Sequence, residues 1–212
     1  MDITPLFADF SRIEQSIGLP KDFITKLIEE DDWSFIIKAH AVVEASIAHM
    51  LVTHTDTRLA EVYSRMALGG RVSKLSFAES LNLIRPHEGT VVKLISELRN
   101  RLVHNVKFIS FDLKEYFRAM PDQKREEFSV QLSGLASVSN DKEITSFVNQ
   151  SLLESPKEVL AMAILYLLAK TLFQIDPEAR VMATKKSEQG AILLLLVAVF
   201  LVVIGATSQQ KS

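Results

Sequence analysis

The chain has 212 residues, a formal net charge of −2 and no cysteine. This length suits one domain with an additional segment, and the missing cysteine excludes disulfide scaffolds, cysteine–zinc sites and thiol catalysis. The near-neutral charge gives no global sign of a nucleic-acid-binding surface.

Apolar residues recur at helical spacing along nearly the whole chain, which predicts an all-α fold. Residues 1–30 are expected to contribute two N-terminal helices. The first runs from Pro5 to Ile17, with the proline at the first helical position, and the second covers about 21–30. The acidic run Glu29–Asp32 then favours the start of a new helix through the helix dipole.

The main helical domain is predicted over residues 31–176. It opens with a long helix from Trp33 to His54, and the broad apolar stripe of this helix indicates a central place in the core. The shorter helices predicted after it are Ala60–Met66, Val72–Ile84, Thr90–His104, Asp112–Met120 and Pro121–Leu132. Ser133–Asp141 is rich in Ser, Gly and Asn and is expected to form a loop.

The last helix of this domain is predicted from Ser155, because the four residues Ser155–Glu158 form a capping box with proline at its first helical position. It contains Val159–Ala169, eleven apolar residues in a row. That run is too short to cross a bilayer, so it is predicted to be a core helix. The polar residues 177–190 are expected to form a stalk.

The segment Ala191–Thr207 lacks charge and is predicted to be a single transmembrane helix. As a helix it is roughly 26 Å long, which is close to the thickness of a bilayer core. A buried core helix usually carries a polar face, and this segment has none. Only the short tail 208–212 follows. Three basic residues precede the span in the stalk and one follows it, which favours a cytoplasmic location for the large N-terminal domain.

The positive charge of the chain is concentrated in residues 70–107, which carry a net charge of +4 in a chain whose total is −2. Asn100 and His104 lie here, one helical turn apart, so the amide can orient the imidazole. Arg99 and His104 are five residues apart, about 140° around an ideal helix. They converge if the helix ends near His104, if Arg99 bends round, or if a second subunit supplies a partner.

The pattern Arg99-Asn100-x-x-x-His104 resembles the signature of the HEPN superfamily. Two earlier stretches add to the resemblance. Lys38–Ile47 looks like the early long helix of branches related to the mannitol operon repressor, and Leu75–Ile84 precedes a chain break and the Arg-Asn helix in the same order. The resemblance covers roughly residues 30–110. It implies a helical bundle that is usually a homodimer and, in many members, a metal-independent ribonuclease or toxin.

The resemblance also implies roles for individual residues. In HEPN ribonucleases the motifs of two subunits face each other, so that Arg99 would stabilise phosphorane charge and His104 would accept the 2′-OH proton. Asn100 would orient His104, and Glu44 would support the site by pairing with Arg99 or Arg101. This chemistry needs no metal and no cofactor.

Other interpretations of the same residues are open. Arg99 and Arg101 are also typical of a solvated helix face, His104 of a helix C-terminus interacting with the dipole, and Glu44 of a structural ion pair. His40 and Glu44 at i and i+4 form half of a metal site, but no second pair accompanies them, so no metal site is expected.

Two functional hypotheses follow. Some HEPN branches, including the mannitol-repressor-like branch, serve as binding or regulatory modules. The first hypothesis is therefore a membrane-anchored, dimeric interaction or regulatory module with an unidentified protein partner, and the acidic balance of the chain favours it. The second is a membrane-anchored endoribonuclease or toxin-like effector that cleaves RNA with Arg99 and His104.

Overall fold

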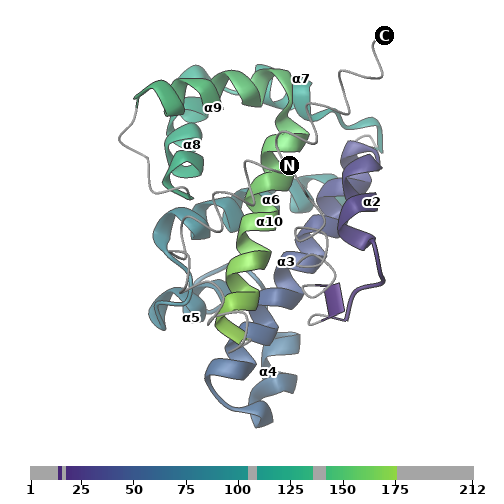
Figure 1. The fold of residues 1–212 in the computed structure, drawn as a ribbon, viewed down its shortest axis with the longest axis vertical. Coiled ribbons are helices and arrows are strands. Elements are labelled where there is room, and N and C mark those ends of the chain that lie inside the picture. Colours follow the sequence, from purple (N-terminus) through teal and green to yellow (C-terminus); the bar gives the residue numbers. More distant parts are fainter. Residues whose placement is uncertain (1–13, 16–17, 105–108, 136–141, 176–212) are drawn as a thin grey trace, which may run out of the picture.

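The computed structural model describes residues 14–15, 18–104, 109–135 and 142–175, and within this part the chain is helical without any strand (Figure 1). The all-α prediction is therefore confirmed. The helices are α2 (Phe23–Glu29), α3 (Asp32–His54), the 3-10 helix η1 (Thr57–Leu59), α4 (Ala60–Arg65), α5 (Lys74–Ser80), α6 (Pro86–Val103), α7 (Leu113–Arg118), α8 (Asp122–Leu135), α9 (Lys142–Glu154) and α10 (Pro156–Ile175). The predicted helix Pro5–Ile17 lies almost wholly outside the described residues, as do the stalk 177–190, the span Ala191–Thr207 and the tail 208–212.

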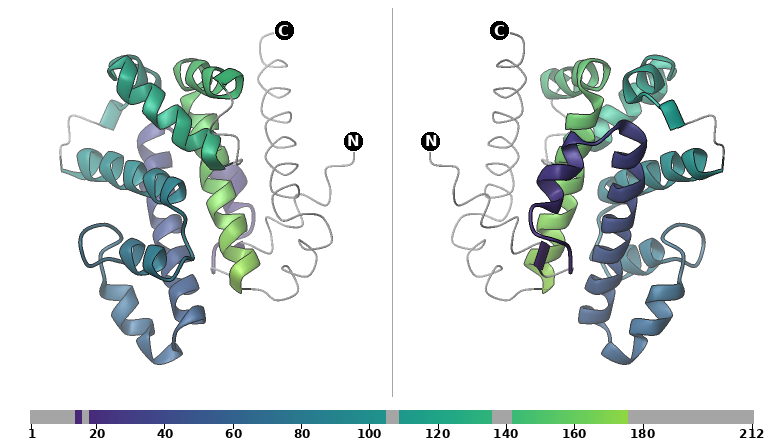
Figure 2. Two further views of the ribbon diagram at one scale, coloured as in Figure 1. Left: turned by 90° about the vertical axis from the view of Figure 1, so that its left-hand side faces the viewer. Right: turned by 90° about the vertical axis from the view of Figure 1, so that its right-hand side faces the viewer.

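Helices α3 and α10 form the centre of the bundle and run side by side along its long axis (Figures 1 and 2). Helices α4, α5 and α6 pack on α3, while α7, α8 and α9 close the upper end. Within α10, Leu160–Ala169 is buried except for the partly buried Met162. The prediction of a core helix over Val159–Ala169 is thus confirmed, because a bundle centre surrounds this helix with other apolar side chains.

Both central helices are also long and apolar enough to cross a membrane. In each of them, however, more than half of the apolar window is buried inside the bundle, 56% in α3 and 59% in α10. Burial against other helices already accounts for their apolar character.

Three predicted boundaries are wrong for identifiable reasons. The helix predicted over Val72–Ile84 covers only Lys74–Ser80, because the Ser73 hydroxyl caps its start and the chain turns back at Asn82, where φ is 57°. The loop predicted over Ser133–Asp141 does not include Ser133–Leu135, since α8 continues to Leu135. The hydroxyl of Ser133 donates to the Ser129 carbonyl at 2.9 Å, so this serine is satisfied inside the helix.

The third wrong boundary is the start of α6, which was expected at Thr90. The helix begins at Pro86, and the predicted break Arg85–Gly89 forms its first turn. Proline is suited to the first helical position. Gly89 fits here because a Cβ at this position would lie 2.2 Å from a Glu79 carboxylate oxygen, so the missing side chain permits close packing against α5.

Candidate functional site

Helix α6 places the sequence motif at the edge of the bundle. Its apolar side chains pack toward α3 and α8 and are buried; they are Val91, Val92, Leu94, Ile95, Leu98 and Leu102. The helix ends at Val103, and His104 occupies the C-cap position with φ −89° and ψ −1°. One of the three conditions for convergence of Arg99 and His104, a helix end near His104, is therefore met.

The start of α6 is fixed by a buried ionic cluster around Glu88, whose side chain is fully buried. Glu88 accepts a hydrogen bond from the Arg85 backbone N–H at 2.7 Å and pairs with the Arg85 guanidinium at 2.7 Å. From α10, Lys170 also pairs with Glu88, and the Tyr166 hydroxyl donates to it at 3.2 Å. These bonds hold α6 to α10 and so position the motif at the other end of the helix.

At the motif itself, a hydrogen bond connects the side chains of Arg99 and Asn100, and His104 takes no part in it. Arg99 Nη1 donates to Asn100 Oδ1 at 3.0 Å. Asn100 and His104 are exposed, and in the part of the chain that the structure describes no hydrogen bond links them. Within one chain, the structure thus brings Arg99 to Asn100 and leaves His104 separate from both.

Arg101 faces a different neighbour, the ring of Tyr116 on α7. Its guanidinium carbon lies 5.6 Å from the ring centroid, which is cation–π geometry. The two residues line a pocket of about 490 Å³ together with Phe111 and Lys124. Burial raises the pKa of Tyr116, and the nearby Glu97 raises it further, so the hydroxyl stays protonated. This pocket was missed because its α7 residues are distant from Arg101 in sequence.

Glu44 forms a structural ion pair with Lys74, which is one of the interpretations that the sequence left open for this residue. Lys74 Nζ lies 2.5 Å from Glu44 Oε1, while His40 Nδ1 lies 3.8 Å from Glu44 Oε2. The reason is packing, because the first turn of α5 lies directly on α3 and inserts Lys74 into the bundle with 2% exposure. A buried ammonium requires a close carboxylate, and Glu44 supplies it.

Electrostatic interactions connect the cluster of His40, Glu44 and Lys74 to the motif on α6. Burial lowers the pKa of His40; the Glu44 carboxylate opposes that shift, and the positive charges of Arg99 and Lys74 add to it. His40 is therefore neutral near pH 7, and Arg99 lies within electrostatic range of the cluster. Sequence reasoning singled out His40 and Glu44 but missed Lys74. The sequence feature that indicates a buried Lys74 is its position on the apolar face of α5, one turn before the buried Ala78.

Among residues 14–15, 18–104, 109–135 and 142–175, no group of three or more His, Asp or Glu side chains is arranged to hold a metal ion. No family model matches the sequence, and no curated protein and no solved structure is detectably similar to the chain.

Proposed function

We propose that this chain is a membrane-anchored, HEPN-like helical domain that acts as a dimeric interaction or regulatory module. The observation that carries the proposal is the division of the motif between two positions. Arg99 is joined to Asn100 and lies within electrostatic range of His40 in the His40–Glu44–Lys74 cluster, and His104 is exposed at the C-cap of α6. A second copy of the chain, facing the first across the end of α6, would complete a site that one chain leaves open.

Exposed apolar side chains beside the motif support an interface at this end. Val103 is 40% exposed between Leu102 and His104, and Ile109, which follows the motif in the chain, is 66% exposed. A central apolar contact with arginine beside it is the common composition of an interface hot spot. The end of α6 offers both.

The membrane anchor is the second part of the proposal. The uncharged segment Ala191–Thr207 would cross the bilayer once and keep residues 1–190 in the cytoplasm. Two chains held in the same membrane meet at a higher effective concentration than two chains in solution. Anchoring therefore favours a dimer even where the interface is small.

Replacing Arg99 and His104 together with alanine is expected to weaken the dimer by about tenfold or more, because truncating an arginine at the centre of an interface typically costs above about 1.4 kcal/mol. Sedimentation equilibrium of the full chain in detergent micelles measures the change. The matched control replaces Arg118 and His49 with alanine, because both residues are exposed and lie outside the motif. A dimer of unchanged strength in the motif variant, or a chain that is monomeric throughout, would contradict the proposal.

A second candidate function is metal-independent cleavage of RNA. It is favoured by the basic and titratable side chains that reach the surface on the last turns of α6, where Arg101 and His104 are exposed and Arg99 is half-buried. Across a dimer, a guanidinium from one chain and an imidazole from the other would be available to one phosphate.

If the chain is a ribonuclease, the full protein in micelles cleaves single-stranded RNA in the presence of EDTA. His104→Ala should then lower the cleavage rate by about a hundredfold or more, as expected for loss of a general base. Gel electrophoresis of a labelled RNA follows the reaction, and His49→Ala serves as the control. Intact RNA, or equal cleavage by His104→Ala, rules this candidate out and leaves the interaction module.

A further inference from the structure

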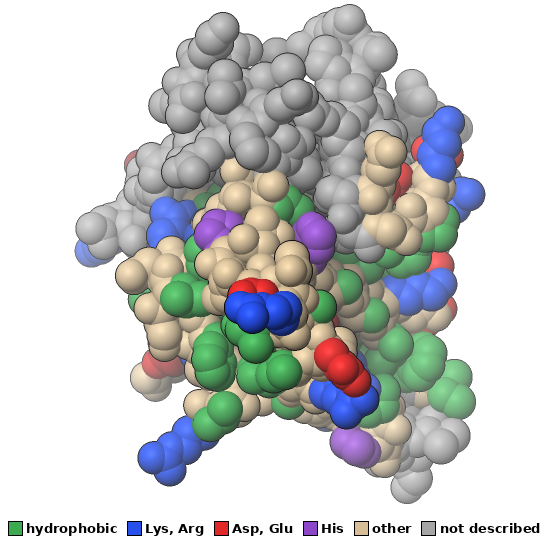
Figure 3. Space-filling model, turned by 90° about the horizontal axis from the view of Figure 1, so that it is seen from below, with side chains coloured by type: hydrophobic (Ala, Val, Ile, Leu, Met, Phe, Trp, Pro, Cys, Tyr) green, Lys and Arg blue, Asp and Glu red, His purple; other side chains and the backbone are tan. Residues whose placement is uncertain are grey.

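A second exposed apolar surface lies at the opposite end of the molecule from α9. It consists of Leu59, Val62, Val72, Phe77 and Leu81, which are between 38% and 70% exposed. We refer to these five residues as the lower apolar surface. The rings of Tyr63 and Phe77 meet edge to face at 6.3 Å and so join α4 to α5. Seen from below in Figure 3, hydrophobic side chains gather around a few charged ones at this end.

Arginine side chains accompany the lower apolar surface. Arg58 and Arg65 are paired with Asp56 and Glu61 at 2.6 Å and 2.5 Å. Arg71 is exposed one residue before Val72, and in the described part of the chain it forms no ion pair. Exposed apolar side chains with basic residues beside them are the composition of proteins that lie in the interface of an anionic bilayer.

The last described residues of the chain lie at this same end. Helix α10 ends at Ile175, and Gln174 Nε2 donates to the Leu83 carbonyl at 3.2 Å. Leu83 follows Leu81 of the lower apolar surface by two residues. Figures 1 and 2 show the end of α10 at the level of α5, with α4 projecting below both. Residues 176–190 then lead to the uncharged segment, and they can span about 22 Å if helical or about 50 Å if extended. The bilayer is therefore within reach of the lower apolar surface.

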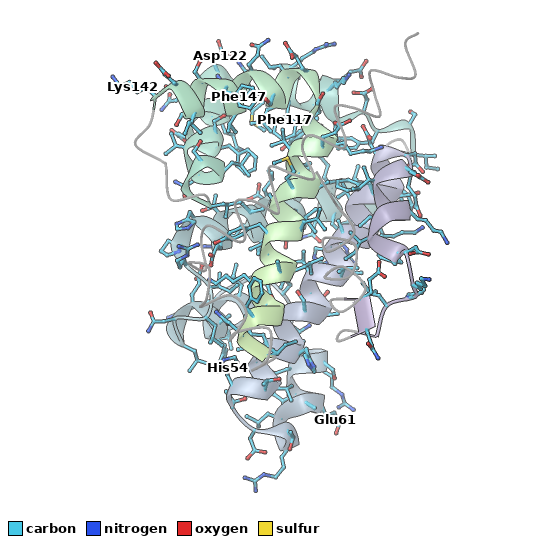
Figure 4. The ribbon with its side chains drawn as sticks, viewed as in Figure 1. His54, Glu61, Phe117, Asp122, Lys142 and Phe147 are labelled. Atoms are coloured by element: carbon cyan, nitrogen blue, oxygen red, sulfur yellow. The ribbon has the colours of Figure 1, made fainter. Side chains whose placement is uncertain are left out.

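We propose that the lower apolar surface rests in the interfacial layer of the bilayer that anchors the chain, with Val62, Val72 and Phe77 among the acyl-chain carbons nearest the headgroups and Arg71 at anionic lipid headgroups. The proposal rests on the membrane anchor of the proposed function. It places the end of α9 away from the membrane, as Figure 4 indicates by the positions of His54 and Glu61 at one end and of Lys142 and Phe147 at the other. A projecting end suits a flat lipid surface better than a second copy of the same convex surface.

The missing cysteines make a direct test possible, because a single introduced thiol can be labelled alone. The full chain is reconstituted in vesicles of phosphatidylcholine and phosphatidylglycerol, with an environment-sensitive fluorophore on Val62→Cys, Val72→Cys or Phe147→Cys. Phe147 is the matched control, since it is an exposed apolar residue (56%) at the far end. Nitroxide-labelled lipids then report contact with the bilayer, iodide reports contact with water, and flotation reports anchoring.

Probes at residues 62 and 72 should lose about half or more of their fluorescence to lipid nitroxides, since interfacial side chains sit about 5–10 Å into the headgroup and acyl boundary. The probe at residue 147 should be quenched by iodide alone. Adding Val72→Glu should reduce lipid quenching at residue 62 without changing flotation.

Each other result overturns the proposal in a recognisable way. Iodide quenching without lipid quenching at residue 62 places the surface in water. Shielding from both quenchers places it against protein, such as a second copy. In both cases the chain still floats, so the anchor stands and only the docking is wrong. A chain that does not float overturns the anchor itself, and the docking with it.

Discussion

Replacing Glu88 with glutamine is expected to lower the free energy of unfolding by about 3–5 kcal/mol, the usual cost of breaking a buried ion pair by removing one partner. The carboxylate is fully buried between Arg85 and Lys170, and the substitution leaves both cations without its negative charge. Urea unfolding of the full chain in micelles measures the effect. The only tryptophan, Trp33 at the start of α3, reports the unfolding of the bundle.

Glu79→Gln is the matched control, since Glu79 pairs with Lys93 at the surface at 3.4 Å, and exposed pairs contribute only about 0–1 kcal/mol. The loss caused by Glu88→Gln should shrink when Lys170 is also replaced by methionine, because the buried cation is then gone. Equal losses for Glu88→Gln and Glu79→Gln would show that the cluster around Glu88 does not hold α6 to α10.

The contribution of Glu88 should also depend on pH. Burial alone would raise its pKa, but the Arg85 backbone N–H and the positive charges of Lys170 and Arg85 outweigh burial and lower it. A carboxyl group whose pKa is lowered by folding stabilises the native state fully above its ordinary value of 4.5, and this stabilisation is lost as the pH falls through the folded-state pKa. Unfolding curves below pH 4.5 should therefore converge for the parent chain and Glu88→Gln.

The second large effect is expected for Phe117→Ala, which should cost about 3–5 kcal/mol. Phe117 is fully buried on α7, where its ring stacks on Phe128 at 6.1 Å and meets Tyr116 edge to face at 5.3 Å. Removing the ring leaves a cavity between α7, α8 and α9 that rigid helices cannot close. The chemical control is Phe147→Ala, because this exposed ring lies nearby on α9 (Figure 4) and should change stability by less than about 0.5 kcal/mol.

Thermal melts of the full chain in micelles, followed by far-ultraviolet circular dichroism, separate these two variants. Phe117→Ala should also melt in one step with the rest of the bundle, because α7 packs on the central helix α10. A melting temperature equal to that of Phe147→Ala would mean that the α7–α9 end is not part of the cooperative core.

The long helices could be predicted from sequence because their apolar stripes are long and their ends carry strong signals. Asp31 accepts a hydrogen bond from the Ser34 backbone N–H at 2.9 Å and starts α3 within the acidic run expected to do so. Helix α9 was missed. Its signal was present, because Ile144, Phe147, Val148 and Leu152 recur at helical spacing, but the only helix start assigned after the Ser133–Asp141 loop was the capping box at Ser155. The start of α6 was misjudged because Pro86 and Gly89 are typical of chain breaks, whereas here one begins the helix and the other permits close packing.

Less of the candidate site could be predicted. Spacing along one helix correctly placed Asn100 and His104 one turn apart at the end of α6, where both are exposed. It said nothing of Lys74, which reaches Glu44 only because α5 folds back on α3, thirty residues later in the chain. Contacts of that kind depend on tertiary packing, and a pattern read along one segment does not contain them.

The attachment of α10 to α6 has a mechanical consequence. Lys170 and Gln174 bind Glu88 and the Leu83 carbonyl, at the start of α6. Tension along the chain at Ile175 would thus load this ionic junction first. His104 lies about 24 Å farther along the helix, at 1.5 Å per residue. In a chain anchored as proposed, movement of the membrane would therefore act on this junction before it reached the surface around Arg99 and His104.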